Sequence, residues 1–207
     1  MTKKLRVLLI GALTTMIGCS VGYGGIIKLR SGTVDFLKGE TRVNVEYSYD
    51  GMTVGKFARE QDYLDKKVAD YNAKEPGKGD RWRQNWVNDR ALRFQPKFEE
   101  LINHHLAARK TSLQFGSFKD AKYTLILRTT FTEPGWNVTI AARPAYMSAE
   151  ATFGETQNRA NPLAVFTITK SPGQGVMGVE YDTGSRVAES YAKAGKELGV
   201  FIAKKLK

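Results

Sequence analysis

The sequence predicts an α+β domain in which helices pack on one face of an antiparallel sheet of about four to five strands. Four segments have the residue patterns of strands: residues 41–49, 122–132, 146–153 and 163–170. Three other segments repeat apolar residues at helical spacing: residues 57–74, 80–108 and 185–206. The last three strand segments follow one another without a helix between them, and this order indicates an antiparallel meander.

The first predicted strand covers residues 41–49. Val43, Val45 and Tyr47 alternate with polar residues, which is the period-two pattern of a strand with one buried face. Asp50-Gly51 then gives a turn signal. Whether residues 33–37 form a partner strand stays open at this point.

Two helices are predicted between residues 57 and 108. The first ends before the Pro76-Gly77 breaker, and Asp80 is a plausible N-cap for the second. Counting 100° per residue, one apolar stripe of the second helix is the predicted core face: Val87, Ala91, Phe94, Phe98, Leu101 and His105. Pro96 removes a backbone hydrogen bond and predicts a kink, so the two halves need not keep one phase.

A polar turn that ends in Asn161-Pro162 separates the predicted strands at residues 146–153 and 163–170. A final helix is predicted over residues 185–206. Ala194 and Gly195 predict a close approach of this helix to the sheet. Lys204 and Lys205 suit a helix C-terminus, where the helix dipole favours positive charge.

Composition indicates one globular domain, assigned to residues 31–207. Apolar residues make up 42% of the chain and charged residues 26%, which excludes an intrinsically disordered protein. The formal net charge of +11 favours anionic partners through long-range attraction. A positive surface that only aids solubility is the alternative reading of this charge.

The lone cysteine, Cys19, follows a segment with the marks of a secretory signal. Lys3, Lys4 and Arg6 precede an apolar run at residues 7–17, and small residues stand before the cysteine. This run is shorter than the roughly 20 residues that a spanning helix needs.

The residues Met16-Ile17-Gly18-Cys19 resemble the lipobox of bacterial lipoproteins, with Met16 where leucine is usual. This resemblance implies a signal peptide at residues 1–18, cleavage before Cys19, acylation of Cys19 with palmitate-type chains, and a lipidated tether at residues 19–30. It also implies a cell-envelope location, at the outer membrane and facing the periplasm. Ordinary signal cleavage and an uncleaved N-terminal anchor are the alternatives.

The order of predicted elements behind this signal is distantly similar to the curli-secretion and cell-wall-synthase-activator lipoproteins. That similarity implies a non-catalytic binding or assembly-accessory role. The expected partners are the membrane, through the lipid anchor, and an envelope protein or an anionic envelope polymer, with no nucleic acid. A lipid-tethered hydrolase of envelope polymers is one alternative. A basic nucleic-acid-binding module is another, if the N-terminus is not a signal.

Tryptophan and arginine side chains are the candidate partner-binding residues, since both types are over-represented at interface hot spots. Trp82 and Trp86 are neighbours on one helix surface, away from the predicted core stripe. The full set is Trp82, Trp86, Arg90, Arg93, Trp136, Arg128 and Arg143. The alternative is that the tryptophans cover a sheet edge or plug an end of the same domain.

No catalytic residue, cofactor or metal site is predicted. Residues 173–178 match the spacing of a dinucleotide fingerprint, but no strand follows the next helix, so the context is wrong. His104 and His105 are the only histidines, and a zinc site needs three or four ligands. Glu99 and Glu100 diverge on a helix and do not form a glycosidase pair.

Overall fold

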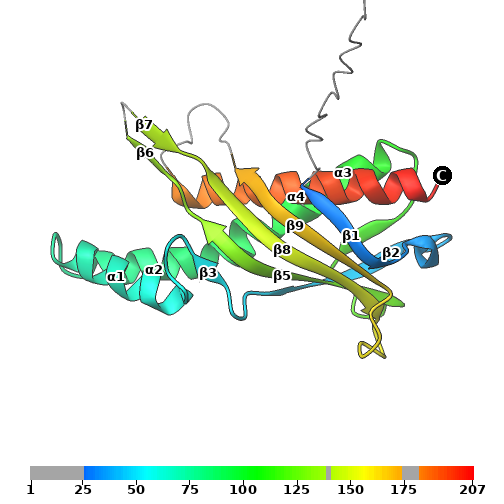
Figure 1. Cartoon of the computed structure of the whole chain (residues 1–207), viewed down its shortest axis with the longest axis horizontal. Coiled ribbons are helices and arrows are strands. Elements are labelled where there is room, and N and C mark those ends of the chain that lie inside the picture. The colour runs from blue at the N-terminus through cyan, green and yellow to red at the C-terminus, as the bar shows by residue number, and fades with distance from the viewer. Residues whose placement is uncertain (1–25, 139–140, 174–181) are drawn as a thin grey trace, which may run out of the picture.

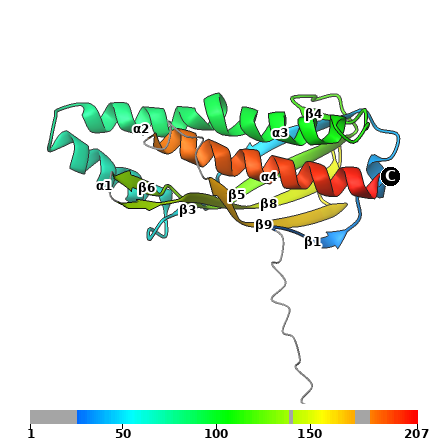
Figure 2. The ribbon, with the colours of Figure 1, turned by 90° about the horizontal axis from the view of Figure 1, so that it is seen from above.

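The computed structural model describes residues 26–138, 141–173 and 182–207. Within these residues the protein is an α+β structure, as the sequence predicts: a mixed sheet carries helices on one of its faces (Figures 1 and 2). The predicted signal peptide and the lipidation at Cys19 lie outside the described residues. Residues 27–30, assigned above to the tether, form part of the first strand.

The main sheet has seven strands: β1 (Ile27–Gly32), β2 (Arg42–Ser48), β3 (Thr53–Val54), β4 (Gln114–Gly116), β5 (Tyr123–Glu133), β8 (Ala145–Glu155) and β9 (Ala164–Gly173). Their order is β1-β9-β8-β5-β2-β4, with β3 paired to β5 beyond the end of β2. A separate ribbon consists of β6 (Trp136–Val138) and β7 (Ala141–Arg143). Residues 35–37 form the short 3-10 helix η1 (Asp35–Leu37) rather than a strand.

The sheet is mixed, which corrects the predicted antiparallel sheet of about four to five strands. The β5-β8-β9 meander is antiparallel as predicted, and β1 adds to it in the same sense. In contrast, β2 pairs parallel to both β4 and β5. A parallel pair needs a crossover connection, and the helices between residues 60 and 107 provide it.

Four α-helices are described: α1 (Glu60–Asn72), α2 (Lys78–Asp89), α3 (Gln95–Ala107) and α4 (Thr183–Lys205). The π turn η2 (Arg90–Phe94) joins α2 and α3 into one continuous helix. At its end the Gln95 amide donates to the Arg90 carbonyl five residues earlier. Because Pro96 has no N–H for the Leu92 carbonyl, a π turn accommodates the proline without ending the helix.

The main core lies between the sheet and the α3/α4 layer (Figure 2). Phe98, Ile102 and Leu106 of α3 are fully buried there. The predicted stripe is correct at Phe94 and Phe98, but Leu101 and His105 are only half-buried. It is wrong before the π turn, where Val87 is 44% exposed. A π turn adds a residue to one helical turn, so a stripe of constant phase cannot continue through it.

Helices α3 and α4 run parallel and touch through their backbones. A Cβ atom built on Gly195 would lie 2.3 Å from the Phe98 carbonyl oxygen, and one on Gly199 would lie 2.7 Å from that of Ile102. The close approach predicted for Gly195 therefore exists, but its partner is α3 and not the sheet. Only glycine permits this helix separation, because any Cβ would meet main-chain atoms.

One carboxylate enters the α3–sheet interface. The Glu99 side chain accepts a 2.9 Å hydrogen bond from the Tyr47 hydroxyl of β2. Burial raises the pKa of Glu99, and the Tyr47 hydrogen bond opposes that shift.

We expect Glu99→Gln to raise the free energy of unfolding at neutral pH, because it removes a charge that is costly to bury. A carboxyl whose pKa is raised by folding contributes stability at low pH, and this contribution is lost as the pH rises through the folded-state pKa. The advantage of the variant should therefore shrink as the pH falls. Urea unfolding between pH 4 and 8 measures it, with the exposed neighbour Glu100→Gln as control. An advantage that does not change with pH would contradict this account of Glu99.

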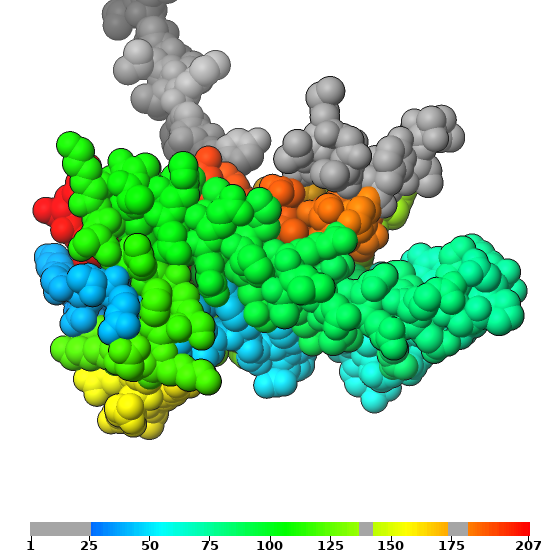
Figure 3. All heavy atoms as spheres, turned by 180° about the vertical axis from the view of Figure 1, so that it is seen from behind, coloured from blue at the N-terminus to red at the C-terminus, as the bar shows by residue number. Residues whose placement is uncertain are grey.

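Helices α1 and α2 extend beyond the sheet as a helical hairpin (Figures 1 and 3). Their own small core contains Met52, Val54, Tyr63, Leu64 and Trp86. Within the described ranges, none of the helices has the length and apolar composition needed to span a membrane.

Candidate binding site

Aromatic rings gather where α1 packs on α2, and we call Tyr63, Tyr71, Trp82 and Trp86 the aromatic cluster. Neighbouring ring centroids lie 5.2 Å apart for Tyr63 and Trp86 and 5.8 Å apart for Trp82 and Trp86. Trp86 is 6% exposed, whereas Trp82 is half-buried. Trp86 thus lies inside the α1–α2 core, and Trp82 forms part of its surface.

Arg90 lies on the π turn and ties this hairpin to the sheet. Its Nη2 donates to both carboxylate oxygens of Glu60, at 2.5 and 2.6 Å, and its guanidinium lies 4.1 Å from the centre of the Tyr49 ring. The Trp86 indole N–H also donates to Glu60, at 2.6 Å. Because the Arg90 and Glu60 side chains are only 20% and 19% exposed, Arg90 is held within the fold.

A hollow of about 410 Å³ opens between α2, the π turn and the start of α4, and we call this hollow the recess. This volume falls in the usual range of ligand pockets. Aromatic walls come from Tyr71, Trp82 and Trp86, and the N-terminal end of α4 contributes Asp182, Thr183 and Gly184. Asn85, Asn88, Asp89, Leu92 and Arg93 complete the lining.

Arg93 forms ion pairs with both carboxylates of the recess, Asp89 and Asp182. Its Nε lies 3.0 Å from the Asp89 carboxylate, and its Nη1 is ion-paired with Asp182. Burial raises the pKa of Asp89, against the pull of Arg93. At Asp182 burial acts in the same direction, but hydrogen bonds from Arg93, Ser185 and the Gly184 amide outweigh it, and the pKa is lowered.

Asp182 is also the N-cap of α4, since its Oδ1 accepts the Gly184 amide at 3.0 Å. Both carboxylates of the recess are therefore engaged in structural contacts. Asn85 and Asn88, in contrast, are exposed, and within the described residues their side-chain amides make no hydrogen bond. The recess thus offers free amides and aromatic surface, which suit binding through hydrogen bonds and ring contacts.

The other predicted residues lie away from the recess. Trp136 is 46% exposed on β6, and its Cα partner across the ribbon is Arg143. Arg143 reaches Glu133 at 3.2 Å. Arg128 lies on β5 opposite Glu150, with which it pairs at 3.4 Å. The structure thus brings Trp136 together with Arg143 and places Arg128 elsewhere, and their role in partner binding stays a prediction.

The sequence analysis predicted Arg93 but missed other lining residues, among them its two partners Asp89 and Asp182. Asp89 and Arg93 stand four residues apart, a spacing that signals an ion pair on a helix. Asp182 precedes a helix start and reads as an N-cap. These signals predict local structure only, and none indicates that α2 and α4 meet.

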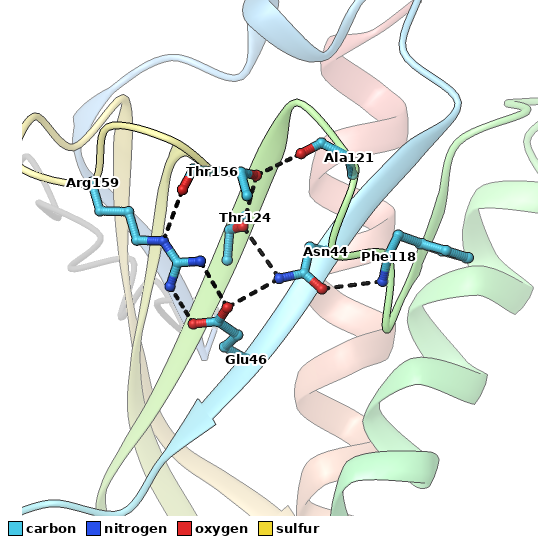
Figure 4. Close-up of polar contacts among 7 residues, drawn as sticks. All are labelled: Asn44, Glu46, Phe118, Ala121, Thr124, Thr156 and Arg159. Carbon is cyan, nitrogen blue, oxygen red and sulfur yellow. Dashed lines mark hydrogen bonds and ion pairs between the residues drawn. The ribbon is translucent and has the colours of Figure 1, made fainter.

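A second polar cluster, at β2 and β5, is satisfied by its own members (Figure 4). The buried Asn44 accepts the Phe118 amide and donates to Thr124 and Glu46. Thr156 Oγ1 donates to the Ala121 carbonyl at 2.6 Å and lies 2.9 Å from Thr124 Oγ1, so Thr124 must be the donor of that contact. Both threonine hydroxyls therefore have an acceptor, and the hydrogen bonds of the cluster hold neighbouring segments of the fold together.

Arg159 closes the same cluster from the β8–β9 connection. Its guanidinium donates to both carboxylate oxygens of Glu46, and these hydrogen bonds are the main reason that the pKa of Glu46 is lowered. The contact fixes the connection to β2.

We expect Asn44→Ala to cost about 2 kcal/mol of unfolding free energy, because it leaves the Phe118 amide without its acceptor and removes the hydrogen bond that the buried Thr124 hydroxyl accepts. Chemical denaturation measures this loss. The matched control is the exposed Asn161→Ala, which should change stability by less than about 0.5 kcal/mol. Equal unfolding free energies of the two variants would show that the hydrogen bonds of Asn44 in Figure 4 do not stabilise the fold.

Among the described residues, no group of three or more histidine, cysteine, aspartate or glutamate side chains is placed to hold a metal ion. No protein-family model matches the chain. No curated protein matches it either.

Two solved structures are similar to the chain at a low level. One is the PelC dodecamer from Paraburkholderia phytofirmans, with a TM-score of 0.40 and 12% sequence identity, covering 87% of this chain and 97% of that one. The other is a point variant of the same dodecamer, with a TM-score of 0.34 and 10% identity, covering 87% and 98%. Similarity at this level does not establish a shared fold or function.

Proposed function

We propose that the protein is a lipid-anchored component of a bacterial cell envelope, at the outer membrane and facing the periplasm, with a non-catalytic binding or assembly-accessory role. The observation that carries the proposal is Cys19, which follows a basic and then apolar segment and closes the sequence Met16-Ile17-Gly18-Cys19. A diacylglyceryl thioether at this cysteine, with acyl chains on its freed amine, ties the mature chain to the membrane.

The recess supports binding over hydrolysis. A carboxylate that acts as a general acid or base has to reach the proton it transfers. Asp182 accepts hydrogen bonds from Arg93, Ser185 and the Gly184 amide, and Asp89 is paired with Arg93. Because structural contacts use both carboxylates, the recess fits a partner or ligand that is held and not cleaved.

Membrane fractionation of the full chain in a Gram-negative host tests the proposed address. The wild-type chain should sediment with membranes and resist salt extraction, and Cys19→Ala should lose this association because no thioether forms. Ser20→Ala, one residue on, is the matched control and should behave as the wild type. A Cys19→Ala variant that stays in the membrane fraction would refute the lipid anchor.

A further inference from the structure

The recess has an aromatic wall made of Tyr71, Trp82 and Trp86. The Trp82 ring centroid lies 5.7 Å from that of Tyr71 and 5.8 Å from that of Trp86, so the three rings are in contact. Trp86 donates its indole N–H to Glu60, and its one polar atom is therefore already used. The wall is an apolar surface on which the apolar face of a ligand can pack.

Polar groups without partners lie beside these rings on α2. The side-chain amides of Asn85 and Asn88 and the indole N–H of Trp82 make no hydrogen bond with any described residue. Successive members of this set are three positions apart, so they are neighbours on the helix surface. Each amide both donates and accepts hydrogen bonds. The recess thus offers free donors and acceptors next to an apolar wall.

The charged groups of the recess neutralise one another. Arg93 is the one cation among the described lining residues, and it is ion-paired with both carboxylates, Asp89 and Asp182. Asp182 also accepts the Gly184 amide and the Ser185 hydroxyl. Because a charged ligand would find each group of opposite sign already paired, the recess favours a ligand without net charge.

Gly184 lets the start of α4 pack directly on the Asp89–Arg93 pair. A Cβ atom built on Gly184 would lie 2.1 Å from an Asp89 carboxylate oxygen and 2.8 Å from Arg93 Nη1. The ion pair of Arg93 with Asp182 joins the same two elements, the π turn and α4. These contacts hold the walls of the recess together before a ligand binds, and preformed walls lower the entropy cost of binding.

We propose that the recess binds a neutral pyranose unit of an envelope glycan. A pyranose carries C–H groups on its faces, which pack on the rings of Trp82 and Tyr71. Its edge carries hydroxyls, which bond to the Asn85 and Asn88 amides. An extended peptide binds through main-chain hydrogen bonds to a sheet edge, and no strand is among the described elements that line the recess. This inference rests on the binding role proposed above and adds the chemical class of the ligand.

Titration of the full chain with neutral trisaccharides tests the proposal, with tryptophan fluorescence as the signal because Trp82 lines the recess. The detergent must lack a sugar head group, which would compete for the site. At least one of chitotriose, cellotriose and maltotriose should bind saturably. Chitotriose alone would indicate an N-acetylated wall glycan as the source, and the glucose trisaccharides an unacetylated polysaccharide. Binding only of trigalacturonic acid, only of the uncharged peptide N-acetyl-trialanine amide, or of no probe would overturn the proposal.

Alanine variants of the two free amides locate the binding. Asn85→Ala and Asn88→Ala should each weaken binding about fivefold, and both together at least about tenfold, because each removes hydrogen bonds to a neutral ligand. Both residues are exposed, and unchanged thermal unfolding verifies folding. Gln84→Ala is the matched control, since Gln84 is an exposed amide of the same helix that does not line the recess.

Equal affinity of the wild type and the double variant for the sugar would overturn the proposal, because the sugar would then bind elsewhere. Membrane fractionation of Cys19→Ala does not depend on the recess. The lipid anchor and the sugar site therefore fail separately.

Discussion

Gly195→Val is expected to lower the free energy of unfolding by about 3 kcal/mol or more, because α3 and α4 touch through their backbones at this residue. The added Cβ would lie 2.3 Å from the Phe98 carbonyl oxygen, and a main-chain atom cannot move aside as a flexible side chain can. The two helices would have to separate, which opens the core around Phe98 and Ile102.

Smaller changes at the same interface give a graded comparison by chemical denaturation. Gly195→Ala should cost more than Gly199→Ala, where the corresponding distance is 2.7 Å. Both costs are offset in part by the better helix propensity of alanine, about 1 kcal/mol. Lys196→Ala, between them, should be nearly neutral. A stabilising Gly195→Ala would mean that α3 and α4 are farther apart than the structure has them.

Trp86→Ala is expected to cost about 3–5 kcal/mol, the usual cost of truncating a buried aromatic side chain. Its ring packs on Tyr63 and Trp82, and its indole N–H donates to Glu60, which would lose that contact together with the packing. The loss should concentrate in the α1–α2 hairpin, because these contacts join the two helices.

Hydrogen exchange of α1 and α2 amides, with denaturation of the whole chain, measures this effect. Trp136→Ala is the matched control, since Trp136 is 46% exposed and should change stability by less than about 0.5 kcal/mol. If Trp86→Ala left α1 and α2 protected, Trp86 would be a surface residue available to a partner and not part of the core.

The sequence predicts those elements whose signal is local. Strand β2 and the long strands β5, β8 and β9 follow from alternation, and the continuous helix over α2 and α3 follows from apolar spacing and the breaker at Pro76-Gly77. Strands β3 and β4 contain two and three residues and are too short to give a pattern. Strand β1 was missed because residues 27–30, its larger part, were assigned to the predicted tether.

Strand partners and the helix interface depend on contacts between distant segments. The parallel pairing of β2 with β5 is possible because the 74 residues from 49 to 122 separate Ser48 from Tyr123 and form the crossover. Nothing within β2 encodes its direction. Gly195 was predicted to lie at a close contact with the sheet, but its neighbour is α3. A small residue indicates close packing without indicating which element packs against it.

The candidate site was predicted in part. Tryptophan and arginine at helical spacing singled out Trp82, Trp86, Arg90 and Arg93, and these residues do gather at the π turn. Burial then divides them: Trp86 is buried behind the recess wall and Arg90 is held in the fold, whereas Trp82 and Arg93 are the more exposed residues of the recess. The exposure of Leu92 was not predictable, because it depends on the π turn and on where α4 begins.

The intact mass of the protein extracted from membranes of a Gram-negative host tests the central claim, the lipid anchor, most directly. The account predicts a chain that lacks residues 1–18 and carries acyl mass on Cys19, with no such species from Cys19→Ala. A full-length, unmodified chain in the soluble fraction would contradict it, and the net charge would then make nucleic acid the next partner to test.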